Sequence, residues 1–298
     1  MIAFHPIYIH PLPDNHRFPM DKYDLLQRQL ILEGIADESS FFLPQQILEE
    51  DLLWVHSEEY WKRLKNLELT EREQRVSGFV HSKQLIEREM TIMEGTRKAT
   101  EIALKEGLGF NIAGGTHHAF FDKGEGFCLL NDQVIAAHYL LNNTKIQRIL
   151  IIDLDVHQGN GTAALTENID SIFTFSMHGA GNYPLKKENS NIDIELKDGT
   201  TDKDYLFLLE SNLYAIASQL QPEFVFFQSG VDVLESDKLG RISLSQKGCF
   251  QRDVLVYEMT RQLQVPVVTT MGGGYSPMLK DIVNAHTNTF KAAFSILT

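Results

Sequence analysis

Four short apolar runs, each followed at once by polar side chains, constrain the fold of this chain more than any other feature. They are rich in β-branched or aromatic residues and occupy residues 148–152, 171–175, 224–227 and 265–268. Continuous apolar character, rather than alternation, is typical of strands covered on both faces in a parallel sheet. Helical patterns separate the runs, for example at residues 204–219 and 246–263. We therefore predict an α/β fold built from right-handed βαβ units, with a central, mostly parallel sheet flanked by helices.

The first hundred residues are more helical and more charged than the rest of the chain. Helix-period apolar positions recur at residues 21–32, 57–67 and 81–105. We expect these helices to pack around the sheet and to shape the rim of a pocket. The 298-residue sequence contains no internal repeat, low-complexity tract or Gly/Ser/Pro linker, so we predict a single domain over residues 1–298.

The composition argues against several classes of protein and of site. A formal net charge of -13 without a cluster of Lys or Arg argues against binding to nucleic acid and mildly favours a cationic partner. The sequence has neither an apolar run of the roughly 18 residues that a membrane span needs nor a secretory signal, so we expect a cytoplasmic protein. Two cysteines, Cys128 and Cys249, are too few for a disulfide framework or a cysteine-rich zinc site. Any metal must therefore be held by histidines and carboxylates.

Polar and ionisable side chains that could bind a ligand or catalyse a reaction follow the end of each apolar run. The four runs are followed in turn by residues 153–157, 176–178, 229–232 and 272–275. The carboxyl ends of the strands in an open α/β sheet form the edge at which ligands bind. We therefore expect one site assembled from four loops.

A D-x-D-x-H pattern after the first run offers ligands for a metal ion. Alternate residues of an extended segment point to the same side, so Asp153, Asp155 and His157 can converge. Oxygen and imidazole ligands suit a divalent cation. The alternative is a solvated, acidic strand end. Asp232 adds a carboxylate at another strand end, where the alternative is a helix-capping or turn aspartate.

Two glycine-rich turns carry further candidates. Residues 114–118 join two glycines, which let the backbone turn tightly, to His117 and His118, whose imidazoles suit acid–base chemistry near neutral pH. Residues 272–275 end in Tyr275, whose hydroxyl is suited to donate to a developing oxyanion. Taken alone, the histidine pair and the tyrosine are each more commonly structural. A phosphate-binding turn is a further alternative at residues 272–274, although the G-x-G-x-x-G spacing and a following P-loop lysine are missing.

Taken together and in this order, these segments resemble the histone deacetylase superfamily. Further matching motifs are GFCLLND at residues 126–132, HQGNG at residues 157–161 and SMH at residues 176–178. Residues 16–20 and 54–60 also resemble family segments, less specifically. The resemblance implies the arginase/deacetylase fold and the zinc-dependent hydrolysis of the amide bond of N-acyl-lysine, acetyl or longer, in protein or peptide substrates.

The resemblance also implies a role for each matched residue. One zinc ion would be bound by Asp155, His157 and Asp232, with Fe²⁺ as a further candidate because two carboxylates make a hard site. The implied catalytic residues are His117, His118, Tyr275, Asp153 and Asn160. A structural potassium ion would be held by oxygens around Asp153, Asp155, His157, Ser176 and Met177. The implied substrate channel is lined by Gly126, Phe127, Tyr183 and Leu239.

One departure from the family pattern concerns Asn160, where many members have an aspartate as the partner of the second histidine. A neutral amide does not stabilise an imidazolium as a carboxylate does. We therefore expect His118 to be less basic than its counterpart in those members. Residues 157–161 and 236–240 are most similar to the class IV branch and its bacterial relatives.

Three other functions fit parts of the same pattern. The substrate could be an acetylated polyamine or another small amide in place of acyl-lysine. A binuclear manganese hydrolase of the arginase type would need a second metal cluster, for which Asp237 offers a carboxylate near Asp232. A non-catalytic protein would bind acyl-lysine without turnover. The sequence leaves these alternatives and the oligomeric state open.

Overall fold

The computed structural model describes residues 1–297, and an eight-stranded sheet lies at its centre. The strand order is β2-β1-β3-β8-β7-β4-β5-β6, and every pair of neighbours is parallel. The predicted α/β fold, with a parallel sheet flanked by helices, is therefore confirmed. The strands are β1 (Ile2–Ala3), β2 (Phe41–Phe42), β3 (Leu108–Asn111), β4 (Ile149–Asp153), β5 (Ile172–Gly179), β6 (Ile192–Leu196), β7 (Phe224–Gln228) and β8 (Val267–Thr270).

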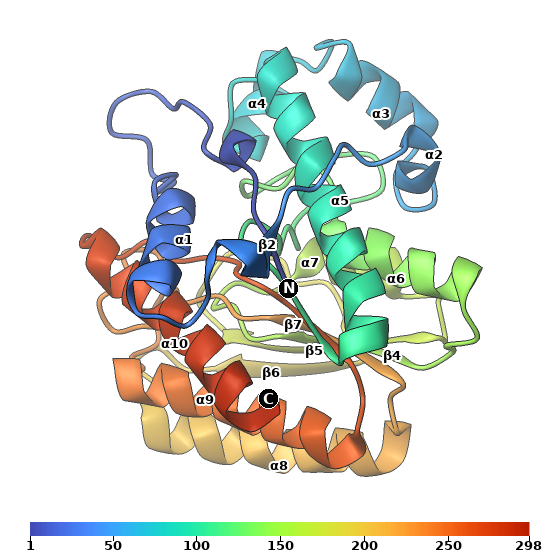
Figure 1. The fold of residues 1–298 in the computed structure, drawn as a ribbon. Coiled ribbons are helices and arrows are strands. Elements are labelled where there is room, and N and C mark those ends of the chain that lie inside the picture. Colours follow the sequence, from blue (N-terminus) through green and yellow to red (C-terminus); the bar gives the residue numbers. More distant parts are fainter. Residues whose placement is uncertain (298) are drawn as a thin grey trace.

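Helices cover both faces of the sheet (Figure 1). In this view α8, α9 and α10 lie below the sheet, α5 and α6 lie above it, and α2, α3 and α4 gather near the far end of α5. α1 packs against α10. The helices are α1 (Lys22–Leu32), α2 (Glu49–Leu52), α3 (Glu58–Lys65), α4 (Glu71–Ser77), α5 (Lys83–Glu106), α6 (Asp132–Asn143), α7 (Asn160–Thr166), α8 (Asp202–Leu220), α9 (Gln246–Leu263) and α10 (Leu279–Leu297). Within residues 1–297, no helix is both long enough and apolar enough to cross a bilayer.

The long helix α5 shows how local sequence sets the boundaries of an element. The Ser82 side chain accepts a hydrogen bond from the Leu85 N–H at 3.1 Å and caps the N-terminus of the helix. The helix ends at Gly107, whose φ of 84° lies in the left-handed region that glycine adopts readily. β3 begins at the next residue, so this turn sends the chain directly into the sheet.

The four apolar runs form β4, β5, β7 and β8, and the helical patterns correspond to α1, α3, α5, α8 and α9. Four strands were not predicted. β1 and β2 have two residues each, too few for any periodic pattern, and β3 has four residues with a glycine among them. β6 lies at the edge of the sheet and is only partly buried. The first hundred residues therefore extend the sheet as well as packing around it.

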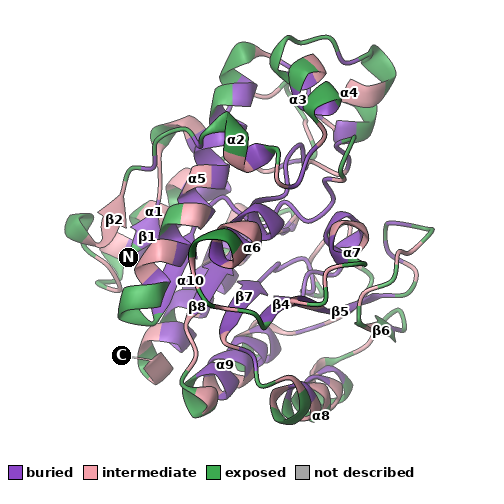
Figure 2. Cartoon of the chain, turned by 90° about the vertical axis from the view of Figure 1, so that its right-hand side faces the viewer, coloured by how far each residue is buried: buried purple, intermediate pink, exposed green. Residues whose placement is uncertain are grey.

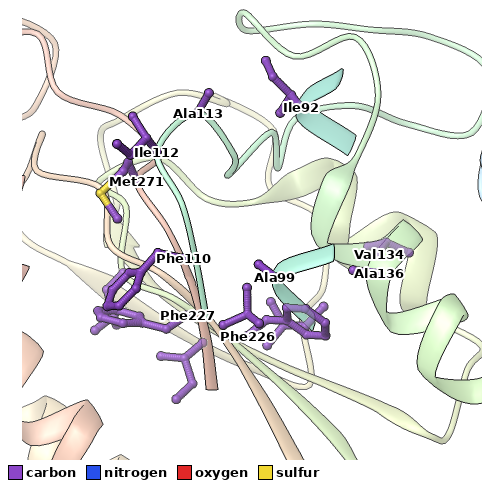
Figure 3. Packing of buried hydrophobic residues seen from close by; sticks show 14 of the residues in the cluster. Ile92, Ala99, Phe110, Ile112, Ala113, Val134, Ala136, Phe226, Phe227 and Met271 are labelled. Atoms are coloured by element: carbon purple, nitrogen blue, oxygen red, sulfur yellow. The ribbon is translucent and has the colours of Figure 1, made fainter. Parts of the chain in front are cut away.

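The buried core follows the sheet (Figure 2), and every residue of β4 and β7 is buried. Figure 3 shows members of this core from β3 and β7, including Phe110, Phe226 and Phe227, together with Ala99 of α5 and Val134 of α6. Because both faces of the central strands are covered, apolar residues occupy them without alternation. The polar residues that follow these strands are thereby brought to the carboxyl edge of the sheet.

Candidate functional site

The candidate site lies where β4, β7 and β8, which are neighbours in the sheet, reach their carboxyl ends. A buried side chain of α9 supports two of the loops that follow. Arg252 donates through Nη1 to the carbonyl oxygens of Leu154 and Gly230, and it is paired with Asp253 at 2.8 Å. The loops after β4 and β7 therefore share one support.

Asp155, His157 and Asp232 form a buried group whose ligand atoms all lie within 4.8 Å of one another. Nδ1 of His157 is 3.1 Å from Oδ1 of Asp155 and 3.0 Å from Oδ2 of Asp232. Within residues 1–297, no other group of at least three His, Cys, Asp or Glu side chains is arranged to hold a metal ion. Two carboxylates and an imidazole are a donor set that divalent metals accept, so these residues fit an ion such as zinc.

The charges of these three residues depend strongly on one another. Burial and the neighbouring Asp155 carboxylate raise the pKa of Asp232 to about 7. Burial by itself lowers the pKa of His157, but its hydrogen bonds to Asp155 and Asp232 outweigh burial and raise that pKa to about 10. Two carboxylates buried side by side repel each other unless positive charge lies beside them. The group therefore favours a bound cation.

Backbone atoms hold both carboxylates in place. The Gly273 N–H donates to Oδ2 of Asp155 at 2.8 Å, and the Val156 N–H donates to Oδ1 of Asp232 at 2.9 Å. A Cβ atom at Gly230 would overlap the Asp155 carboxylate, and one at Gly273 would overlap the Asp232 carboxylate. These two glycines therefore allow the backbone to approach the metal-ligand candidates closely, a role that the sequence analysis did not identify.

The adjacent imidazoles of His117 and His118 have ring centroids 4.0 Å apart. Each ring is held through Nδ1 by a different partner. Nδ1 of His117 lies 2.7 Å from Oδ2 of Asp153, and Nδ1 of His118 lies 2.6 Å from Oδ1 of Asn160. Both histidines are buried. The partners thus differ in charge, as the sequence pattern indicated.

The two histidines differ in basicity. Burial lowers the pKa of His117, but the charges of Asp153 and Asp155 outweigh burial and raise it. Burial, followed by the positive charges of His117 and His157, lowers the pKa of His118 well below its ordinary value. The hydrogen bond that the Asn160 oxygen accepts from His118 acts in the opposite direction and raises the pKa. Near neutral pH His118 is therefore neutral and able to accept a proton.

Tyr275 lies beside this group, with its ring centroid 6.2 Å from that of His157. Burial, followed by the negative charges of Asp155 and Asp232, raises the pKa of Tyr275 well above its ordinary value, so the phenol keeps its proton. The Tyr275 N–H donates to Oδ2 of Asp237 at 2.6 Å. The other oxygen of Asp237 accepts from two further backbone N–H groups, at 2.8 and 3.0 Å. Asp237 thus shapes the loop beside Tyr275.

A pocket of about 380 Å³ borders the site. All four residues predicted to form the substrate channel line it: Gly126, Phe127, Tyr183 and Leu239. The same pocket reaches His118, His157 and Tyr275. The Tyr183 ring meets the His118 ring edge-on, with 5.1 Å between centroids, and the Tyr183 side chain is partly exposed. The pocket therefore connects the surface with His118 and with the metal-ligand candidate His157.

The residues implied for a monovalent cation lie on two adjacent strands and the loop after β4. Ser176 of β5 is paired in register with Asp153 of β4, and both Ser176 and Met177 are buried. Oδ1 of Asp153 accepts from the Asp155 N–H at 3.1 Å, and the Ser176 hydroxyl lies 2.9 Å from Nδ1 of His178. Oxygen atoms from several of these residues are thus concentrated at one edge of the sheet.

Three charged residues that the sequence analysis did not single out support the site. Lys22 donates to the carbonyl oxygen of Gly272 at 2.8 Å, and Glu125 accepts from the Asn160 amide at 2.6 Å. Arg252 holds the loops after β4 and β7. All three are buried. A charged residue within a helix or loop pattern predicts solvent exposure, so no local signal identified their contacts.

Comparison with known proteins gives a consistent result. The family model of the histone deacetylase domain matches residues 16–290. An uncharacterized protein of Picosynechococcus is 38% identical over 292 residues, which cover 98% of this chain and 97% of that protein. Histone deacetylase 2 of Arabidopsis thaliana is 30% identical over 269 residues, or 87% of this chain and 70% of that protein. A solved HDAC homolog from Aquifex aeolicus superposes with a TM-score of 0.84 at 24% identity over 98% of this chain and 83% of its own. An HDAC homolog complexed with SAHA has a TM-score of 0.84 at 25% identity, covering 99% of this chain and 87% of its own.

Proposed function

Because the chain belongs to the histone deacetylase family, we propose that it hydrolyses the amide bond of N-acyl-lysine in protein or peptide substrates, with one bound zinc ion. The observation that carries this proposal is the buried group of Asp155, His157 and Asp232, whose His157 lines a pocket that also reaches His118 and Tyr275. We further propose that residues 1–298 form one catalytic domain, which the family match over residues 16–290 supports.

Asp155, His157 and Asp232 would hold the zinc ion. A bound zinc ion supplies Lewis acidity, which polarises a carbonyl group and lowers the pKa of a water from about 15.7 toward about 7. His118, neutral at pH 7, would accept the proton of the attacking water and return it to the leaving lysine amine. Asp153 would orient His117 beside it, since the two side chains share a 2.7 Å hydrogen bond.

Tyr275 would stabilise the negative charge that develops on the substrate oxygen. Its raised pKa keeps the phenol protonated, as a hydrogen-bond donor must be. Phe127 and Tyr183 would form the walls around the acyl-lysine stem, because both line the pocket above the histidines. Their rings would exclude water from the stem while leaving its amide within reach of the polar groups.

The charge at the pocket favours acyl-lysine over an acetylated polyamine. Arg17 and Arg241 line the pocket, and its lining within the described residues contains no Asp or Glu. A polyamine carries further positive charges along its length, and these would lie near the Arg17 guanidinium and near Arg241, whose charge is partly offset by Asp198 at 3.4 Å. An acyl-lysine side chain is neutral and places no charge at this position.

The arginase-type alternative is less well supported. Within residues 1–297 a single group of three metal-ligand candidates is present, and a binuclear site needs further ligands. Asp237 accepts hydrogen bonds from three backbone N–H groups instead. A count of two metal ions per chain by elemental analysis would favour the binuclear alternative. The same measurement, made after purification without chelators, would distinguish zinc from Fe²⁺.

We also propose a structural potassium ion near Asp153, Asp155, His157, Ser176 and Met177, in keeping with the class IV-like motifs. The pairing of Ser176 with Asp153 at the edge of two strands supports this site. Replacing potassium by a large organic cation in the buffer should lower thermal stability. Stability independent of the buffer cation would contradict the proposal.

The proposed reaction is best tested with a panel of acetyl-, medium-chain and long-chain acyl-lysine peptides together with acetylated polyamines. We expect hydrolysis of at least one acyl-lysine peptide, and Asp155→Ala should abolish it. Activity that survives this substitution would contradict the metal-dependent mechanism. Tight binding of acyl-lysine without hydrolysis of any member of the panel would instead indicate a non-catalytic binding protein.

A further inference from the structure

Asn160 lies between two side chains and makes a short hydrogen bond to each. Its Oδ1 is 2.6 Å from Nδ1 of His118, and its Nδ2 donates to Oε1 of Glu125 at 2.6 Å. All three residues are buried. We propose that Glu125 is a positioning residue that, by accepting from the Asn160 amide, keeps His118 in the tautomer protonated at Nδ1.

The orientation of the Asn160 amide is determined by what its two neighbours can donate or accept. A side-chain amide can present either its oxygen or its nitrogen to a neighbour, so Asn160 alone does not determine which nitrogen of His118 carries the proton. An ionised carboxylate only accepts hydrogen bonds, so Glu125 requires the NH₂ group of Asn160 to face it. The Asn160 oxygen must then face His118, whose Nδ1 must donate. The Nε2 atom of the neutral ring is left free to accept a proton.

The opposite orientation of the amide is disfavoured by direct repulsion. It would bring the Asn160 oxygen to the position now 2.6 Å from Oε1 of Glu125, where two acceptors would meet in a buried setting without a proton between them. It would also leave the Asn160 NH₂ facing a ring nitrogen that would have to be unprotonated. Glu125 therefore determines the orientation of Asn160 and, through it, the tautomer of His118.

Glu125 also places a negative charge near His118, the second histidine of the pair. The sequence indicated that this charge is lost where Asn160 replaces an aspartate. In the structure, the Glu125 carboxylate lies behind the Asn160 amide, one hydrogen bond further from His118. Its outer oxygen accepts from Lys123 at 3.1 Å. Burial, followed by the neighbouring Glu125 side chain, raises the pKa of Tyr183.

The kinetic test compares two substitutions that remove the acceptor-only group at position 125 with a control at a distant, exposed position. Glu125→Leu removes the acceptor and should lower kcat by about 10–100-fold with little change in KM, the usual effect of losing a residue that orients a functional histidine. Glu125→Gln keeps the size of the side chain, but its amide can turn either its oxygen or its NH₂ toward Asn160. Because Lys123 donates to the outer oxygen of Glu125, the Gln oxygen would favour Lys123, and we expect a similar loss of kcat. Glu71→Leu, whose replaced side chain is 92% exposed, is the control and should retain the parent kcat.

A double substitution gives the sharpest result. In Asn160→Asp alone, two carboxylates would face each other at about the distance of the present 2.6 Å hydrogen bond, so activity should fall. In the double variant Glu125→Leu with Asn160→Asp, the new carboxylate accepts directly from His118 and needs no support. We expect the double variant to be more active than either single variant. A double variant no more active than Glu125→Leu would overturn the proposal.

A spectroscopic readout tests the tautomer without requiring turnover. The kinetic test rests on the proposed hydrolase function, whereas ¹⁵N NMR of histidine-labelled, zinc-loaded protein does not. The parent and double-variant spectra should show His118 protonated at Nδ1, identified by its loss in His118→Ala. Glu125→Leu and Glu125→Gln, which both lack an acceptor-only group at this position, should not keep Nδ1 as the single protonated nitrogen. Unchanged Nδ1 protonation in Glu125→Leu, with zinc content and melting temperature equal to the parent, would overturn the proposal even if no substrate were found.

Discussion

Nζ of Lys22 donates a hydrogen bond to the carbonyl oxygen of Gly272 at 2.8 Å, joining the first long helix to the turn that carries Tyr275. Lys22 is 1% exposed, and its ammonium lies 5.8 Å from the centre of the Tyr275 ring. Burial lowers the pKa of Lys22 to about 8, against the opposing charges of Asp232 and Asp155. At pH 7 the side chain is still protonated and acts as a donor.

Lys22→Met should therefore destabilise the protein and slow turnover. The substitution keeps an unbranched side chain but leaves the Gly272 carbonyl without its donor, which typically costs about 1–3 kcal/mol in the free energy of unfolding. The turn would relax, and Tyr275 would move relative to the metal-ligand candidates. Chemical denaturation and kcat measure the two effects. Lys83→Met, at an exposed position, is the control, and equal stability of the two variants would contradict the expected role of Lys22.

His56 provides a pH-dependent contribution to stability away from the metal-ligand candidates. Its Nδ1 lies 2.9 Å from the Phe120 carbonyl oxygen, and its Nε2 accepts from the Asn131 N–H at 3.0 Å. Both bonds are satisfied by the neutral ring with its proton on Nδ1. Burial lowers the pKa of His56 to about 4, from the ordinary value of 6.5. The unfolded chain therefore binds more protons than the folded chain between these two pH values.

The sign of the resulting pH dependence follows from linkage. The contribution of neutral His56 to stability is fully present above pH 6.5 and is lost as the pH falls toward 4, by about 3 kcal/mol in all. His56→Gln should flatten the decline of the unfolding free energy between pH 7 and pH 4.5. Other buried histidines contribute to the decline, so the difference between parent and variant is the quantity to measure. Parallel curves would show that His56 does not titrate as expected.

The sequence was most informative where local pattern and tertiary position coincide. The apolar runs that form β4, β5, β7 and β8 lie in strands covered on both faces. Such strands need apolar residues at nearly every position, so their burial can be recognised in the sequence. The polar residues after them were expected to meet because carboxyl ends of parallel strands share an edge. The structure brings Asp155, His157 and Asp232 together there, from loops that follow two different strands.

The remaining features depend on contacts that no local pattern contains. Lys22 and Gly272 are 250 residues apart in sequence, and a lysine in an amphipathic helix ordinarily predicts a solvated position. Asn160 stands where many family members have an aspartate, which indicated that a negative charge beside His118 is lost. The carboxylate that compensates for it belongs to Glu125, in another loop and 35 residues away in sequence. Asp237 was a candidate ligand for a second metal ion because it lies five residues after Asp232. In the structure its carboxylate instead accepts hydrogen bonds from three backbone N–H groups. Spacing identifies candidate residues but not their partners.

Asp232→Asn should separate metal binding from stability. In the metal-free protein, burial and Asp155 raise the pKa of Asp232 to about 7 from 3.8, so folding becomes less favourable as the pH rises through that window. At pH 8 the metal-free variant avoids this cost but also loses the Asp232 charge that stabilises protonated His157, so the metal-free variant and the metal-free parent should differ little in stability. Zinc at about 100 times its Kd should stabilise the parent by about 2.7 kcal/mol and the variant by much less. Thermal melts with and without zinc measure both effects, and equal zinc shifts would argue against Asp232 as a ligand.

Tyr275→Phe should remove an interaction that matters only during the reaction. The ring remains to pack beside Phe18 and Phe127, with centroids 6.2 and 6.0 Å away, so fold and zinc content should be retained. The lost hydroxyl is the proposed donor to the oxyanion, and removing one such donor typically lowers kcat by about 10²–10³. KM should change little, because the neutral substrate carbonyl gains less from the donor than the developing anion does. Tyr214→Phe, at a position that is 78% exposed, is the matched control. If Tyr275→Phe hydrolysed an acyl-lysine peptide as fast as the parent, the oxyanion would have to be stabilised by another group.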